Sequence, residues 1–225
     1  MVESGCALTP QPTLFDLGPM SAGTVYGDGR RADDYYPTAD WCTDAILPHL
    51  PVGGTILEPT CGDGAILRRL LAHTRPTRIV GVELDTGRAE QARGVLRDAD
   101  YRDGEIITGD FLHWAKTAKV RGLGLIVGNP PFSLALDVVK ACIALAAPTR
   151  ATVAMFLRLA FLRLAFLESA ERAPFHHAHP SDVYPLARRP SHTGDGKTDM
   201  AAYAWFCFGP GRIGRVYPPI LGSGA

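Results

Sequence analysis

Apolar residues between positions 35 and 208 follow two alternating patterns, short continuous runs and longer segments with a helical period. The short runs are typical of buried strands and occupy residues 55–58, 78–83, 105–108, 123–128 and 151–157. The helical segments occupy residues 65–72, 86–98 and 134–146. Strands that alternate with helices of this length predict right-handed crossovers and a mostly parallel sheet covered on both faces.

The two ends of this region depart from the alternation. A further short helix is predicted at residues 40–50, with Thr38 as its candidate N-cap. Residues 183–187 and 201–208 have strand patterns with no helix between them, which predicts an antiparallel hairpin. The expected fold class is therefore α/β, a Rossmann-like, mostly parallel seven-stranded sheet that ends in an antiparallel hairpin.

The chain outside this region is rich in Gly, Pro, Ser and Asp. We expect residues 1–34 to form a flexible leader, residues 35–209 the folded domain, and residues 210–225 an irregular tail. A tandem FLRLA repeat at residues 156–165 has a period of five that fits neither a strand nor a helix. We therefore expect its first copy to end a strand and its second copy to open a helix.

The composition excludes several classes of protein. With 225 residues, 46% of them hydrophobic and 20% charged, the chain can bury a core without disulfides or metals. Its five cysteines form no CxxC pair, which argues against a disulfide framework and a cysteine-based zinc site. No uninterrupted run of about 18 apolar residues exists, and the N-terminus lacks a secretory pattern. The sequence predicts a soluble, cytoplasmic protein with no membrane partner.

The formal net charge of zero hides an asymmetry along the chain. Residues 1–110 carry 10 basic and 17 acidic side chains, whereas residues 111–225 carry 13 basic and 6 acidic ones. If the basic half shares one face of the molecule, that face would attract a polyanion. The alternative is that the charges interleave in space.

Three successive predicted strands lead into a carboxylate. Glu58 ends the first strand and is followed by the glycine turn with Gly62 and Gly64, where missing side chains let a ligand approach the backbone. Glu83 ends the second strand and could accept both hydroxyls of a ribose, and Asp110 follows the third and could accept from an exocyclic amine. Parallel strands bind ligands beyond their carboxyl ends, so these acids predict one site.

The glycine turn does not match the phosphate-binding loops. A dinucleotide fingerprint requires a third glycine where this chain has Leu67, and a Walker A loop requires a lysine that is absent after the glycines. A carboxylate at the first strand tip instead suits a ligand with an ammonium group, and an amino acid joined to a nucleoside fits.

The fourth strand ends in Asn129, Pro130, Pro131 and Phe132. The prolines fix the backbone, and the Asn129 side-chain oxygen and a neighbouring carbonyl could each accept one hydrogen of a planar NH2 group. This arrangement would orient the nitrogen lone pair toward an electrophile, while the Phe132 ring stacks on the planar group. We interpret the segment as a site for methyl transfer, although the same residues could form a plain rigid turn.

These residues resemble the S-adenosylmethionine-dependent amino-methyltransferases of the NPPF/Y type, most closely the phage-type adenine-N6 DNA methyltransferases, which have a class I methyltransferase fold. The resemblance covers about residues 35–208 and rests on the segments PTADWCTDAIL, EPTCGDG, GVELD, GDFL and NPPF. It implies S-adenosylmethionine as the cofactor and Asn129, Pro130 and Phe132 as the catalytic residues at the target amine. The cofactor contacts that it implies are Thr38, Glu58, Thr60, Gly62, Gly64, Glu83, Leu84, Asp110, Phe111 and Asn129.

The chain departs from this family in one respect. Such enzymes usually append a sizeable target-recognition domain, and only 16 residues follow Gly209 here. The candidate substrate-binding residues are Arg188, Arg189 and Lys197 in segment 188–206, which could hold DNA phosphates. The same segment could also be an ordinary basic hairpin.

Two further motifs are weaker. Gln11, Leu14 and Phe15 resemble the peptide with which bacterial replication proteins bind the sliding clamp, so the clamp is a candidate partner. The histidine cluster 176–179 has no thiol partners and adjacent histidines aim poorly at one ion, so we expect a solvated loop and no metal site.

The sequence thus predicts an S-adenosylmethionine-dependent DNA adenine-N6 methyltransferase. Two other methyltransferase classes use the same planar NH2 chemistry: protein glutamine-N5 and ribosomal RNA guanine-N2 enzymes. The former mostly carry Tyr where this chain has Phe132, and the latter usually have a second, duplicated domain. A degenerate cofactor-binding module without activity is the non-enzymatic alternative, and the intact motif set argues against it.

Overall fold

The computed structural model describes residues 35–159, 172–191 and 201–222. The expected leader with its clamp-like peptide, the second FLRLA copy and Lys197 lie outside these ranges. The first FLRLA copy begins in a strand, as predicted.

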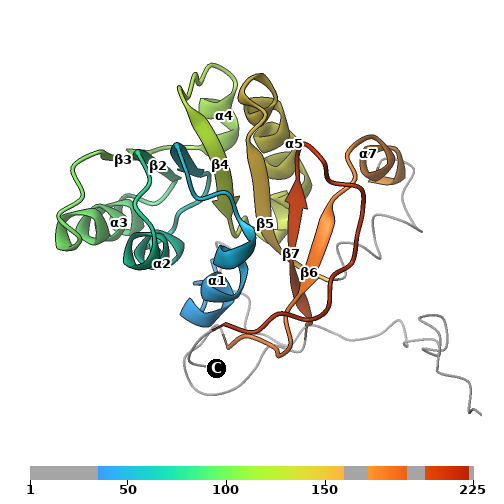
Figure 1. Ribbon diagram of the computed structural model, residues 1–225. Helices are drawn as coiled ribbons and strands as arrows, with labels where there is room; N and C mark the ends of the chain where they lie inside the picture. Colours follow the sequence, from blue (N-terminus) through green and yellow to red (C-terminus); the bar gives the residue numbers. More distant parts are fainter. Residues whose placement is uncertain (1–34, 160–171, 192–200, 223–225) are drawn as a thin grey trace, which may run out of the picture. The chain divides into compact units, whose positions relative to one another are not determined.

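The described residues form one seven-stranded sheet, in the order β3-β2-β1-β4-β5-β7-β6 (Figure 1). The first five strands are mutually parallel, and β7 runs antiparallel to both β5 and β6. The strands are β1 (Thr55–Glu58), β2 (Arg78–Glu83), β3 (Gly104–Thr108), β4 (Leu123–Gly128), β5 (Thr152–Arg158), β6 (Asp182–Pro185) and β7 (Tyr203–Phe208). This confirms the predicted parallel sheet with its antiparallel end.

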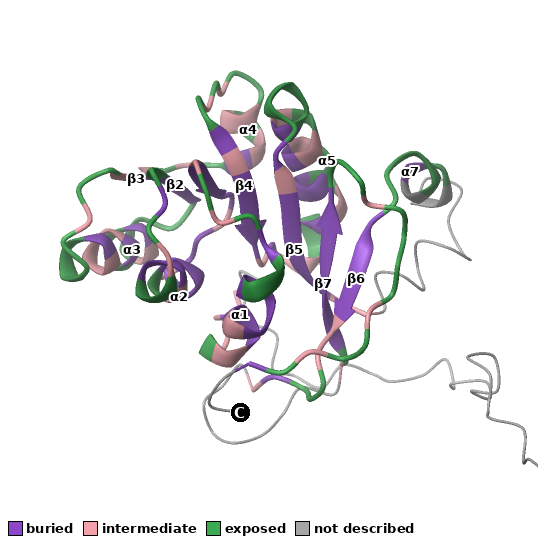
Figure 2. Ribbon diagram, viewed as in Figure 1, coloured by how far each residue is buried: buried purple, intermediate pink, exposed green. Residues whose placement is uncertain are grey.

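Helices cover both faces of this sheet because successive strand residues point to opposite sides. Ile56 packs with α1, α2 and α3, while the next residue, Leu57, packs with α4, α5 and α7. The central strands are buried on both faces, as Figure 2 shows, whereas Ile106 is the one buried residue of the edge strand β3. The helices are α1 (Asp40–Ile46), α2 (Ala65–His73), α3 (Thr86–Asp98), α4 (Phe111–Ala115), α5 (Ala135–Ala146) and α7 (Arg172–Ala178), with short 3-10 turns η1 (Leu47–His49), η2 (Phe132–Leu134) and η3 (Ala147–Thr149).

Three local predictions need correction. The helix predicted at 40–50 changes to a 3-10 turn after Ile46, with Pro48 within that turn. Its N-cap is Ala39, and no side chain caps it, so Thr38 is not the cap. The histidine cluster is not a loop: His176 and His177 lie in α7, which is anchored by the buried Phe175 against Phe208.

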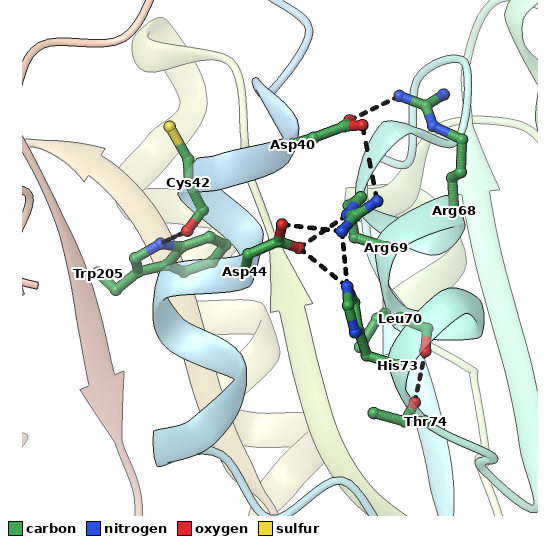
Figure 3. A network of polar contacts seen from close by, with 9 residues as sticks. All are labelled: Asp40, Cys42, Asp44, Arg68, Arg69, Leu70, His73, Thr74 and Trp205. Carbon is green, nitrogen blue, oxygen red and sulfur yellow. Dashed lines mark hydrogen bonds and ion pairs between the residues drawn. The ribbon is translucent and has the colours of Figure 1, made fainter. Parts of the chain in front are cut away.

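Helix α1 is fixed between the sheet and α2 by polar contacts (Figure 3). Arg69 on α2 makes a bidentate ion pair with Asp44, at 2.7 and 2.8 Å. On the other side of α1, the Trp205 indole on β7 donates a hydrogen bond to the Cys42 carbonyl at 2.8 Å. The Asp44 side chain and Trp205 are both buried, so these contacts fix α1 to α2 and to the sheet.

Residues 209–222 run beside β6, the last strand of the sheet. The Val183 amide donates to the Arg215 carbonyl, and the Ile220 amide donates to the Pro185 carbonyl. Asp182 is buried and accepts hydrogen bonds from the backbone amides of Ile213 and Arg215. Residues 209–222 are therefore held along the β6 edge by main-chain hydrogen bonds.

The segment Phe132–Thr149 is, among the described residues, the helical stretch that could cross a membrane by length and composition. Its central helix α5 instead packs on β4 and β5, with Val138, Val139 and Cys142 buried in the core on that face. This is the packing of a helix that covers a sheet.

Candidate cofactor and target-amine site

A cavity of about 320 Å³ lies beyond the carboxyl ends of β1, β2 and β4. Strand order reverses between β1 and β4, which is where open parallel sheets bind their ligands. The volume falls in the range of small-molecule sites. Eleven residues singled out from the sequence line it: Thr38, Glu58, Thr60, Gly62, Glu83, Leu84, Asp110, Phe111, Asn129, Pro130 and Phe132.

Glu58 is a buried acid at the base of this cavity. The residue is 2% exposed, and its Oε2 has no hydrogen-bond partner among the described residues. Burial, and then the neighbouring Asp63 and Glu83 carboxylates, raise the pKa of Glu58 well above its usual value. A buried acceptor without a partner is costly, so this position suits a ligand that brings a cationic donor such as an ammonium group.

The glycine turn shapes the adjacent wall. Gly62 has a φ of +54°, and a Cβ there would lie 2.6 Å from Cε2 of Tyr35, so the ring and the backbone are in close contact. Gly64 also has a positive φ but does not line the cavity. It is the N-cap residue of α2 and packs against Ala92 of α3, which gives it a role in helix packing.

Glu83 lies at the tip of β2 and already accepts three hydrogen bonds. Gly62 donates to Oε2 at 2.9 Å, and the Asp85 amide and Arg88 Nε donate to Oε1 at 2.8 and 3.1 Å. A carboxylate has about four lone-pair sites. One ligand hydroxyl can therefore donate to the Glu83 carboxylate as the structure stands. A second hydroxyl can donate only if Arg88 breaks its hydrogen bond with Oε1.

Asp110 and its neighbours form the far end of the cavity. The Asp110 side chain caps α4 by accepting a hydrogen bond from the His113 amide at 2.7 Å, which leaves its other oxygen for a ligand. Helix α4 was not predicted, since its five residues are too short for a helical period. Leu84 is 68% exposed and Phe111 is buried, so an apolar surface and a packed ring border this carboxylate.

Asn129 has a defined side-chain orientation. Its Nδ2 donates to the Tyr36 carbonyl and to Thr38 Oγ1, both at 3.0 Å. Both amide hydrogens are therefore used on that side, and among the described residues none donates to Oδ1. The amide thus keeps Oδ1 as its acceptor, on a residue that lines the cavity.

Phe132 lies in an aromatic cluster beside Asn129. The Tyr36 ring stacks with it at 5.7 Å, and the Arg158 guanidinium lies 4.1 Å from its ring centroid. Arg158 Nε also donates to the Tyr203 hydroxyl at 3.3 Å. Phe132 thus lines the cavity with its ring held between aromatic and cationic neighbours.

The substrate residues predicted outside the motifs are not part of this cavity. Arg188 is exposed, with its guanidinium 4.5 Å from the centroid of Trp41, and Arg189 is also exposed. Within the described ranges no group of three His, Cys, Asp or Glu residues could hold a metal ion.

Sequence reasoning missed Tyr35, Tyr36, Arg88 and Arg158. Arg88 could have been found, because it lies in the first turn of α3, five residues after the strand-tip Glu83. Tyr36 contributes a main-chain carbonyl, for which no residue type is diagnostic. Arg158 comes near Phe132 only because β5 lies beside β4 in the sheet.

Comparisons with known proteins concern the chain's relatives and its fold. No family model matches the chain. A type II methyltransferase of Paramecium bursaria Chlorella virus XZ-6E, M.CvrRI, is 42% identical over 77 residues, which is 34% of this chain. The type II methyltransferase M.TthHB8I of Thermus thermophilus is 36% identical over 89 residues, or 39% of this chain. The matched segment spans 18% of the length of each relative.

Solved structures share the fold. A modification subunit assigned to a type I restriction enzyme from Vibrio vulnificus YJ016 superposes with a TM-score of 0.59 at 14% identity, over 85% of this chain and 46% of that one. The 23S rRNA methyltransferase ErmE superposes with a TM-score of 0.53 at 19% identity, over 77% and 68% of the two chains. The described residues therefore have the class I methyltransferase fold.

Proposed function

We propose that this protein transfers the methyl group of S-adenosylmethionine to the N6 amine of adenine in DNA. The observation that carries the proposal is the orientation of Asn129, whose Nδ2 is held by Tyr36 and Thr38 so that Oδ1 accepts from a ligand. An acceptor fixed beside an aromatic ring and a cofactor-sized cavity is what a planar amine requires.

The cavity fits the proposed cofactor. Glu58, buried with a partnerless oxygen, would bind its ammonium group, and Glu83 and Asp110 would bind the ribose and the adenine amine. S-adenosylmethionine supplies an electrophilic methyl group on its sulfonium. The chain supplies orientation, and direct displacement needs no covalent intermediate on the protein.

At the target amine, Asn129 Oδ1 and the Pro130 carbonyl would each accept one amine hydrogen. These hydrogen bonds leave the nitrogen lone pair directed away from both acceptors, and they strengthen as the nitrogen becomes positively charged. Phe132 would stack on the ring that carries the amine. Extruding a base from a duplex costs a few kcal/mol, which one stacking contact of about 1–3 kcal/mol and two hydrogen bonds can offset.

DNA is the substrate that we favour because both curated relatives are named type II methyltransferases and because residues 111–225 are basic. Ribosomal RNA is the second candidate, since a 23S rRNA methyltransferase shares the fold. The motif itself also accepts a glutamine amide, which is the remaining alternative.

The test is to express the full chain in a bacterial host without its own adenine methylation and to measure N6-methyladenine in digested DNA by mass spectrometry. We expect the modified base with the native protein and none with Asn129→Ala, which should keep cofactor affinity within about threefold. If ribosomal RNA or a protein glutamine is methylated while the DNA stays unmodified, DNA is not the substrate and the methylated molecule takes its place. Full activity of Asn129→Ala would refute the role of the amide.

A further inference from the structure

We propose that Thr38 is a positioning residue for methyl transfer, whose hydroxyl holds the Asn129 amide in the orientation that the Tyr36 carbonyl selects. This inference rests on the proposed function, because it concerns how the acceptor for the target amine is held. The resemblance to known enzymes implies Thr38 as a cofactor contact, whereas the structure places its Oγ1 against Asn129 Nδ2.

The two partners of the amide differ in what they can do. The Tyr36 carbonyl only accepts, so an Asn129 amide flipped by 180° would place Oδ1 against another oxygen. The Thr38 hydroxyl can donate or accept, and it accepts here because Nδ2 faces it. Together they use both amide hydrogens, and Thr38 is the partner that a side-chain substitution can remove.

The location of Thr38 makes this contact stable. Thr38 is 5% exposed and lies next to Ala39, the N-cap of α1, and Arg69 and Trp205 fix that helix to α2 and to the sheet. Thr38 therefore contacts Asn129, 91 positions away in the sequence, from a buried segment that leads into a fixed helix. The Thr60 hydroxyl also points at Asn129, but it donates to the main-chain carbonyl and cannot orient the amide.

The two variants that separate positioning from packing are Thr38→Val and Thr38→Ser. Valine keeps the shape and removes the acceptor, while serine keeps the hydroxyl. Thr43→Val is the matched control, because Thr43 is a fully buried threonine on α1 whose Oγ1 has no hydrogen-bond partner among the described residues. We expect Thr43→Val to leave activity unchanged.

The first measurement needs neither cofactor nor DNA. The side-chain NH2 signals of Asn129 in a proton–nitrogen NMR spectrum of the full chain are assigned by their loss in Asn129→Ala. We expect their hydrogen exchange to quicken by about tenfold in Thr38→Val, as loss of one hydrogen bond implies, and to stay native in Thr38→Ser and Thr43→Val. Native exchange in Thr38→Val would overturn the proposal.

The second measurement divides cofactor binding from turnover. We expect Thr38→Val to lower kcat on DNA by roughly 10- to 100-fold, with the calorimetric Kd for S-adenosylmethionine changed less than threefold, and Thr38→Ser to restore kcat. Loss of cofactor affinity that accounts for the whole defect would overturn the proposal in favour of a simple cofactor contact. If the native chain methylates no DNA, the proposed function fails and the exchange measurement still decides the role of Thr38. If Thr38→Val does not fold, Thr38→Ala takes its place.

Discussion

Replacing Glu58 by glutamine should make the ligand-free protein more stable while weakening its cofactor binding. Glu58 is 2% exposed, and its Oε2 has no partner among the described residues. Burial raises its pKa most, the Asp63 and Glu83 carboxylates raise it further, and a backbone hydrogen bond from Leu67 opposes them. The neutral form is therefore favoured until a cation arrives.

The sign of the pH dependence follows from this raised pKa. The pKa of Glu58 is higher in the folded state than in the unfolded state, where it is about 4.3. The free energy of unfolding therefore falls as pH rises from the unfolded pKa toward the folded pKa. Glutamine does not titrate, so Glu58→Gln should match the native protein near pH 4 and exceed it increasingly above. Leaving a buried carboxylate charge without a partner costs about 1–3 kcal/mol or more. The neutral amide avoids this cost, which in a domain of this size is roughly 2–12 °C in Tm.

The cofactor should respond in the opposite direction. Loss of a charge-assisted hydrogen bond of about 1.5–3 kcal/mol predicts a Kd for S-adenosylmethionine roughly 10- to 100-fold higher in Glu58→Gln. Binding to the native protein should release a proton from Glu58, so the calorimetric enthalpy should depend on the ionisation enthalpy of the buffer. In Glu58→Gln this dependence should be lost.

The assays are thermal unfolding of the ligand-free proteins between pH 4 and pH 8 and calorimetric titration with the cofactor. Glu105→Gln serves as control, because Glu105 is half-exposed and pairs with Arg78 at the far side of the sheet, where such pairs contribute little. The reasoning fails if Glu58→Gln shows the native pH profile of Tm, or if it binds the cofactor as tightly as the native protein.

Three other substitutions probe the same description. Phe132→Ala should reduce kcat/KM on DNA by about 5- to 100-fold through lost stacking while Phe132→Tyr retains most of it, and steady-state kinetics that rank them equally would argue against stacking. Gly62→Ala should lower the free energy of unfolding by about 1–2 kcal/mol and weaken cofactor binding, because φ is +54° and the new Cβ would collide with Tyr35. An unchanged urea midpoint together with an unchanged Kd for the cofactor would contradict this. Burial raises the pKa of Asp182, but the amides of Arg215 and Ile213 and the Arg212 side chain lower it below the usual value overall. The stability that the Asp182 carboxylate contributes is thus present above the unfolded pKa of about 3.9 and is lost as pH falls through the folded pKa. In denaturant titrations, Asp182→Asn should therefore lower the free energy of unfolding by about 1–3 kcal/mol at pH 7 and change it little at pH 2.

The strands and long helices were predictable because burial on both faces of a parallel sheet leaves continuous apolar runs. The runs predicted at 78–83 and 123–128 coincide with β2 (Arg78–Glu83) and β4 (Leu123–Gly128). The short helices were not predictable in this way. Helix α4 depends on the Asp110 cap, and α7 on one buried ring, Phe175, neither of which produces a period along the chain.

The candidate site was predictable where a residue type identifies the chemistry, as at Glu58, Glu83 and Asn129. It was not predictable where geometry decides. Gly64 belongs to the same turn as Gly62, yet the side of Gly64 where a Cβ would stand packs against α3. The contacts of Asn129 with Tyr36 and Thr38 join positions more than 90 residues apart, which one sequence cannot reveal.

The hydrogen bonds between β6 and the residues after Gly209 also bear on solubility. An unpaired strand edge is a template for joining another chain, and here Val183 and Pro185 have their main-chain partners within the same molecule. A chain shortened after Gly209 would expose that template together with the Asp182 carboxylate. Such a shortened protein would aggregate through its exposed strand edges even with its cofactor cavity intact.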